Sequence, residues 1–142
     1  MQPDQLTLGS LTRENFFMPT SALLVSRDAY DASGGFDSNV EFGEDWDLCL
    51  KLAAISTFTC VPEPLINYRV YDRGMLKPRD QVRQMLQDHL RILDNFFGRK
   101  DIASSRIASG KPLAQSHRYA FAAVHHFAYG DLRRKNSIFQ SI

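Results

Sequence analysis

Cysteine is scarce in this 142-residue sequence, and its two cysteines exclude several kinds of site. Cys49 and Cys60 match neither zinc-ligand spacing nor the Cys-x-x-Cys spacing of redox motifs. Both lie in apolar runs, so we expect buried free thiols, which favours a reducing compartment.

Long apolar runs and an excess of charge are also missing. No apolar stretch approaches the ~20 residues that a membrane-spanning helix needs, and we find no signal peptide. The formal net charge of +1 gives no electrostatic case for nucleic acid or a membrane surface. We expect a soluble chain without a transmembrane segment and without a nucleic-acid partner, either in the cytoplasm or at the inner face of the membrane.

Acidic residues are present, but they are concentrated in one part of the chain. Residues 28–50 contain no Lys or Arg, whereas bases outnumber acids in residues 69–111. Opposed local charge suits a polar cleft for a charged or hydroxylated small molecule, and a solvated surface explains it equally well. The seven acids of the first region are Asp28, Asp31, Asp37, Glu41, Glu44, Asp45 and Asp47.

The first half of the chain reads as a mixture of strands and helices. We predict helical turns over residues 27–33, a glycine turn at 34–35, and a largely buried helix that begins near Asp45. Pro62 and Pro64 interrupt any continuous strand between the last two predicted strands. The predicted strands are a short one before Pro19 and those at 22–25, 57–61 and 65–70.

The second half is predicted to be helical. Apolar residues recur at helical spacing from Val82 to Phe97, and Gly98 follows as a stop. Pro112 opens a second helix that we expect to end at Gly130, with a third beginning at Asp131. We expect its inward face to hold Leu113, Ala120, Phe121, Val124 and Phe127. The predicted fold class is therefore α/β, an α+β region over residues 1–76 followed by a helical tail over 77–142.

The acids at the predicted helix start allow three interpretations. Asp45-Trp46-Asp47 spells the D-x-D with which nucleotide-sugar enzymes hold a divalent cation, but such a pair normally follows a buried strand, and here a helix follows. The acids could simply favour the helix N-terminus, at about 0.3–1 kcal/mol each. One of them could instead be a general base. Trp46 offers an apolar face for a sugar ring, although a Trp at this place is more often part of the core.

Several segments, taken in order and spacing, distinguish these interpretations. The segments, in chain order, are Asn15–Arg27, Gly34–Asp37 (GGFD), Glu44–Leu48 (EDWDL), Leu50–Ala53 and Pro62–Arg69 (PEPLINYR). With these segments, residues 15–73 resemble the C-terminal half of the catalytic domain of family 2 glycosyltransferases, inverting enzymes of GT-A fold that use nucleotide sugars.

This resemblance implies an activity and a set of site residues. Asp45 would be the base that takes the proton of an acceptor hydroxyl, and Glu44 a neighbouring acceptor contact, with Trp46 beside them. Arg69 would face the donor phosphate, or else form a salt bridge at a strand edge. The implied partners are a nucleotide-sugar donor and a glycan acceptor, in polysaccharide or cell-wall biogenesis.

Two departures from the family pattern qualify that expectation. Only fourteen residues precede Asn15, and we find no Gly-rich phosphate loop, so the nucleotide-binding half and its D-x-D are missing. We therefore expect a truncated domain that is inactive alone, and a Mg²⁺ or Mn²⁺ ion whose ligands are not in this chain. Tyr71 stands where the family often has a histidine two residues after the arginine.

An alternative function belongs to a different class. The transferase-like segment could serve as a non-catalytic scaffold or interaction module whose helical tail docks a partner. Self-association through exposed apolar surface is a further expectation.

Overall fold

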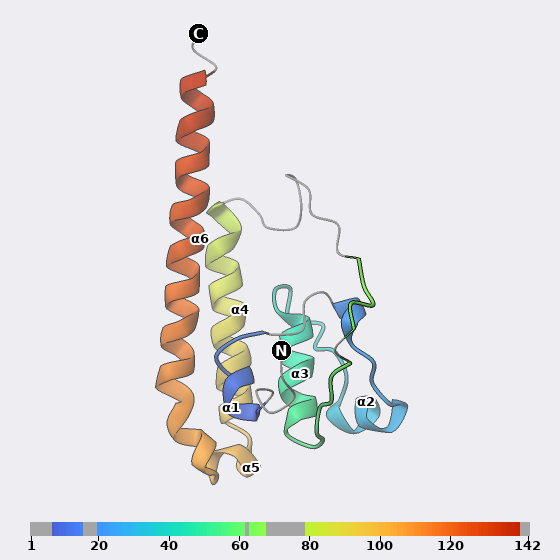
Figure 1. The fold of residues 1–142 in the computed structure, drawn as a ribbon. Helices are drawn as coiled ribbons and strands as arrows, with labels where there is room; N and C mark the ends of the chain where they lie inside the picture. Colours follow the sequence, from blue (N-terminus) through green and yellow to red (C-terminus); the bar gives the residue numbers. More distant parts are fainter. Residues whose placement is uncertain (1–6, 16–19, 62, 68–78, 140–142) are drawn as a thin grey trace.

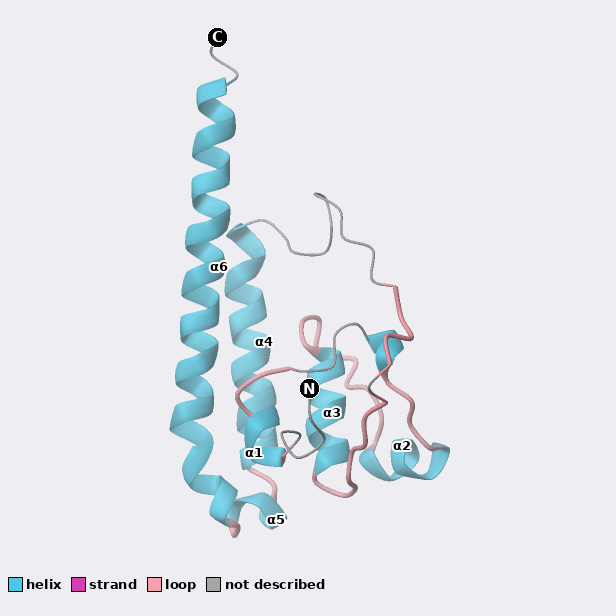
Figure 2. Cartoon of the chain, in the orientation of Figure 1, coloured by secondary structure: helices cyan, strands magenta, loops and turns pink. Residues whose placement is uncertain are grey.

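The computed structural model describes residues 7–15, 20–61, 63–67 and 79–139, and helices dominate these ranges (Figure 1, Figure 2). In chain order the elements are α1 (Leu8–Leu11), the 3-10 turn η2 (Thr20–Ala22), α2 (Arg27–Ser33), α3 (Glu44–Ala53), α4 (Arg79–Phe97), α5 (Lys100–Ala103), the 3-10 turn η3 (Arg106–Gly110) and α6 (Lys111–Phe139). Among the described helices, none combines the length and the apolar character that crossing a bilayer requires.

The predicted α/β class is wrong, because the described ranges contain no β-strand. The strand expected at 22–25 is partly the η2 turn, and residues 57–61 and 63–67 are irregular. A strand needs a neighbouring strand to receive its backbone hydrogen bonds, and β-branched or apolar composition alone does not supply one. The predicted strand before Pro19 and the end of the last one fall largely outside the described residues.

Helix α3 confirms the predicted helix near Asp45. Gly43 precedes it at a φ of 87°, a left-handed conformation that glycine adopts without strain. Most of its side chains are buried, as expected from its apolar residues: Trp46, Asp47, Leu48, Cys49, Leu50 and Leu52. The short helix α2 and the glycine turn after it are also confirmed, with Gly34 ending α2 at a φ of 81°.

Helices α4 and α6 form an antiparallel hairpin, joined by α5 and η3 (Figure 1). Helix α4 ends at Phe97, just before Gly98, as expected. Ile92 is buried as well, although it was not predicted. Of the predicted apolar stripe of α4, the buried members are Val82, His89, Leu93, Phe96 and Phe97, and the half-buried ones are Met85, Leu86 and Leu90. At the closed end of the hairpin, the Lys111 ammonium lies 2.9 Å from the Asp94 carboxylate.

Two predictions for α6 are wrong. The helix continues through Gly130 to Phe139, since a glycine weakens a helix without having to end it. Its buried face holds Ala114, Arg118 and Ala122, whereas the residues expected to point inward are exposed. Small side chains let two helices approach closely, and this packing on α4 leaves the more apolar face of α6 uncovered.

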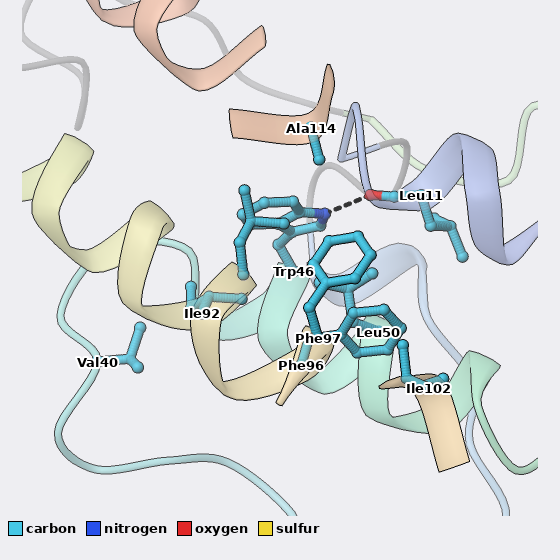
Figure 3. Packing of buried hydrophobic residues seen from close by; sticks show 10 residues of the cluster. Leu11, Val40, Trp46, Leu50, Ile92, Phe96, Phe97, Ile102 and Ala114 are labelled. Atoms are coloured by element: carbon cyan, nitrogen blue, oxygen red, sulfur yellow. Dashed lines mark hydrogen bonds between the residues drawn. The ribbon is translucent and has the colours of Figure 1, made fainter. Parts of the chain in front are cut away.

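One hydrophobic cluster joins the two halves of the chain (Figure 3). Trp46 and Leu50 of α3 pack with residues of α4, α5 and α6, so the predicted parts 1–76 and 77–142 share a core. The division expected near residue 76 lies outside the described residues. The buried members are Leu11, Val40, Trp46, Leu50, Ile92, Leu93, Phe96, Phe97, Ile102 and Ala114.

Candidate functional site

The candidate site is the N-terminal turn of α3, where Glu44, Asp45 and Asp47 lie together. The N-cap residue is Gly43, which has no side chain to cap this helix start. The free amides and the macrodipole of the first turn favour negative charge there. Three acids stand in this one turn, so their individual contacts decide what each one can do.

Asp45 is half-buried and is held by neutral donors. Its Oδ1 accepts hydrogen bonds from the Trp46 amide at 2.7 Å and from Asn15 Nδ2 at 3.2 Å. Its Oδ2 accepts one from the Thr20 hydroxyl at 3.4 Å. No described Lys or Arg lies within ion-pair distance of this carboxylate. Because an ionised oxygen offers about two acceptor positions, the contacts of the described residues leave Oδ2 one position for a hydroxyl.

Asp47 has a different environment, although it is only two residues further on. It is buried, and its Oδ2 lies 2.6 Å from the Lys51 ammonium, one turn along α3. Lys51 also donates to the carbonyl of Gly35 at 3.2 Å, which ties α3 to the glycine turn. Asp47 therefore has a structural role, and the two carboxylates of the D-x-D sequence do not share one environment.

The other predicted site residues differ in burial, and two of them lie outside the described residues. Glu44 is half-buried in the first turn of α3, beside Asp45. The Trp46 indole is 1% exposed and donates from Nε1 to the carbonyl of Leu11 at 2.6 Å (Figure 3). It packs in the core and presents no free face for a sugar ring. Arg69 and Tyr71 lie outside the described residues.

Helix α4 fixes the loop that leads into the site. The Asp88 carboxylate is fully buried, and its Oδ2 accepts hydrogen bonds from the amides of Glu41 and Phe42 at 3.3 and 3.2 Å. Its Oδ1 accepts from Gln84 Nε2 at 3.1 Å and from the Arg91 guanidinium. A side chain 46 and 47 residues downstream thus satisfies the backbone just before α3.

Gly43 makes the second contact between α4 and the start of α3. A Cβ at this position would lie 2.9 Å from Cδ2 of His89 and 3.0 Å from its Nε2. The imidazole therefore occupies the space that any other residue at position 43 would need. Together, Asp88 and His89 set where α3 begins, and so where Asp45 lies.

A buried, partly cationic cluster lies on the core side of this contact. The His89 ring packs edge-on against Trp46, with ring centroids 5.4 Å apart, and the Arg118 guanidinium carbon lies 4.9 Å from the Trp46 ring. Arg118 also donates to the carbonyl of Arg13. Burial, followed by the charge of Arg118, lowers the pKa of His89 to about 4. Its imidazole is therefore neutral at physiological pH.

Cys49 has no features of a nucleophile. Burial, with a smaller contribution from the Asp45 charge, raises the pKa of its thiol to about 12. The thiol therefore stays protonated and packs as a small apolar side chain, as predicted from its apolar surroundings.

The described residues also contain no group of three or more His, Cys, Asp or Glu side chains able to hold a metal ion.

Sequence reasoning did not identify the residues that position Asp45. Asn15 stands in the sequence that carries the family resemblance, but nothing in its spacing links it to Asp45, 30 residues away. Thr20 stands in the same segment and Asp88 outside it, and the sequence does not link either to the site, because their contacts arise from the tertiary fold.

A comparison of the chain with protein-family models, with curated protein sequences and with solved structures finds no match.

Proposed function

We propose that this chain is the acceptor-side part of an inverting glycosyltransferase, with Asp45 as its general base. The carrying observation is the state of the Asp45 carboxylate, which is half-exposed, held by neutral donors and not paired with a described cation. Two other acids of this region differ from it, since Asp47 is paired with Lys51 and Asp88 with Arg91. The order of the GGFD, EDWDL and PEPLINYR segments supports the assignment to this enzyme class.

The chemistry is a single displacement. An acceptor hydroxyl oxygen attacks the anomeric carbon of the donor sugar while the bond from that carbon to the nucleotide diphosphate breaks, and the diphosphate keeps the bonding electrons. Asp45 accepts the hydroxyl proton as the new C–O bond forms. Because attack and departure occur on opposite sides, the configuration at the anomeric carbon inverts.

The local geometry favours Oδ2 of Asp45 as the proton acceptor. Oδ1 already accepts from the Trp46 amide and from Asn15, whereas among the described residues Oδ2 accepts only from the Thr20 hydroxyl. Asn15 and Thr20 fix the plane of the carboxylate without neutralising it, and Glu44 is a candidate contact for an acceptor hydroxyl. A base fixed in this way contributes about 10²–10⁴-fold to the rate.

We also propose how the donor is bound and where in the cell the enzyme acts. A divalent cation, Mg²⁺ or Mn²⁺, would stabilise the departing diphosphate, with ligands that the described residues do not supply. Arg69 is proposed to face the donor phosphate. A cytoplasmic position at the inner face of the membrane, in polysaccharide or cell-envelope glycan synthesis, is part of the same proposal.

The proposal is tested by a near-isosteric change at the base. In an enzyme preparation that contains this chain together with its donor-binding part, Asp45→Asn should reduce sugar transfer by at least about 100-fold. Glu41→Gln is the matched control, because Glu41 is an exposed acid of the same cluster, and it should retain near-normal transfer. Unfolding curves of both variants should match the wild type. Retained transfer in Asp45→Asn would remove Asp45 from the mechanism.

A further inference from the structure

Two carbonyls, at the end of α1 and just after it, are held by side chains from distant parts of the chain. The carbonyl of Leu11 accepts a hydrogen bond from Nε1 of Trp46 at 2.6 Å (Figure 3). The carbonyl of Arg13 accepts one from the guanidinium of Arg118, 105 residues further along the chain. The last carbonyls of a helix have no partner within it, so α3 and α6 supply the donors that α1 itself lacks.

The segment held in this way leads directly to the candidate base. Asn15 stands two residues after Arg13, and its Nδ2 donates to Oδ1 of Asp45 at 3.2 Å. The same Oδ1 accepts from the amide of Trp46. The backbone of residues 11–15 therefore carries one of the donors that fix the carboxylate, and the position of this backbone determines where that donor lies.

Arg118 is a charged residue at a place where an apolar side chain would meet less opposition from burial. It is 7% exposed, and none of the ion pairs among the described residues includes it. Burial lowers the pKa of its guanidinium, and the charge of Glu14 partly opposes this. The carbonyl of Arg13 and the ring of Trp46, 4.9 Å from the guanidinium carbon, offset part of the desolvation. Since an apolar residue in place of a buried charge is often neutral or stabilising, stability alone does not account for Arg118.

We propose that Arg118 is a positioning residue for the Asp45 base, acting through the backbone of residues 11–15 and the side-chain amide of Asn15. Arg118 holds the Arg13 carbonyl from α6, while Trp46 holds the Leu11 carbonyl from α3. Helix α6 thus contributes to the site through the backbone rather than through a contact with substrate. The inference rests on the proposed function, because it takes Asp45 to be the base, but its first test does not use activity.

The first test follows the side-chain amide of Asn15 by ¹⁵N–¹H NMR in the 142-residue chain. The signal is assigned by its loss in Asn15→Ala. Asp45→Asn should change its chemical shift, because the hydrogen bond would no longer go to an ionised carboxylate. Arg118→Met should change it as well, because the segment that carries Asn15 loses one of its two anchors.

Gln115→Met is the matched control, on the same helix and with the same new side chain. Nε2 of Gln115 donates to Asp94 of α4 at 3.4 Å, so this variant removes a polar contact between α6 and α4. The Asn15 signal should stay in place.

Two further replacements separate positioning from packing. Arg118→Lys keeps a long cationic side chain with a donor, so it should return the Asn15 signal most of the way to its wild-type position. The side chain in Arg118→Gln is two bonds shorter and should not reach the Arg13 carbonyl, so this variant should behave like Arg118→Met. It replaces Arg118→Met if circular dichroism shows that the methionine variant does not fold.

The second test measures sugar transfer in the preparation that contains the donor-binding part. Arg118→Met should lower kcat by about 10-fold or more and leave KM for the donor within about 2-fold, because a misplaced base affects the chemical step. Arg118→Lys should recover most of kcat, and Gln115→Met should transfer at a near-normal rate. Because Arg118 acts through Asn15, adding Arg118→Met to Asn15→Ala should lower kcat little further.

The results separate this inference from the proposed function. Transfer retained in Asp45→Asn would remove the base, and with it the role of Arg118. If Asp45→Asn is inactive, an Asn15 signal that responds to neither Arg118→Met nor Arg118→Gln would overturn the positioning role alone. Losses of kcat that simply add in the double variant, or a loss that lies in KM instead of kcat, would overturn it too.

Discussion

The helices around Trp46 and the segment from residue 55 to residue 67 are both rich in apolar residues, yet the helices are buried and most of the described residues of the segment are exposed. Phe58 is an exception, since it is half-buried against the core. Trp46, Leu50 and Ile92 have almost no accessible surface, whereas Val61 is 64% exposed and Leu65 is 73% exposed. In the first region, apolar residues at helical spacing from α3, α4 and α6 meet one another. In the second, apolar residues of β-type composition have no neighbouring strand in the described structure. Apolar content buries a segment only when another element with a matching face lies beside it.

The largest effect is expected at Trp46, the centre of the buried region. Trp46→Ala should lower the free energy of unfolding by about 3–5 kcal/mol, because it leaves a cavity and also removes the hydrogen bond to Leu11. Urea unfolding followed by circular dichroism measures the change. Trp46→Phe keeps most of the packing and should cost clearly less. A loss below about 1 kcal/mol in the alanine variant would show that this region is not the core.

A smaller change in the free energy of unfolding is expected when the pH is lowered, because His89 is buried. The pKa of His89 is lowered to about 4 in the folded chain, from an ordinary value of 6.5. Burial, Arg118 and His125 disfavour the imidazolium, and Asp88 favours it. The unfolded chain therefore binds more protons between these two values, so stability is full above about pH 6.5 and falls as the pH drops toward 4.

The expected loss over this window is about 3 kcal/mol. Urea midpoints measured at a series of pH values give the slope, and the His89→Gln variant supplies the reference, because it does not titrate. The difference between the two proteins isolates His89 from the other titrating groups. An identical slope in both would contradict a buried neutral imidazole.

The smallest effect is expected in the exposed segments. Leu65→Ser and Leu24→Ser, at side chains 73% and 98% exposed, should each change the free energy of unfolding by less than about 0.5 kcal/mol. The same urea titrations measure both. A loss of 2 kcal/mol or more, on the order of a core substitution, would mean that these residues are covered in solution and that the contrast between the two regions is false.

The long helices could be predicted from the sequence because their signals are local. The apolar period from Val82 to Phe97 and the glycine after it define α4, and the acids followed by apolar residues define α3. The buried face of α6 could not be predicted in this way. Its most apolar side is the uncovered one, and packing against α4 selected Ala114 and Ala122 instead. Hydrophobicity alone would predict that the exposed face of α6 is the buried one.

The predicted strands failed for a related reason. Residues 57–61 have the composition of a strand, but a strand is stabilised by its partner rather than by its own sequence. The same holds for the candidate site. Asp45 was proposed from its motif, whereas its contacts with Asn15 and Thr20 depend on chain segments that only the fold brings together.

The contact of Asp88 with the amides of Glu41 and Phe42 has a consequence for anyone who recombines this chain with others. Helix α4 helps to hold the start of α3 in place, so the helical tail cannot be exchanged independently of the rest of the chain. A chimera that takes its tail from another protein must retain an acceptor at position 88 and a flat ring at position 89. Without them, the entrance to α3 would have two unanchored amides and an empty space beside Gly43, and the orientation of its first turn would no longer be defined.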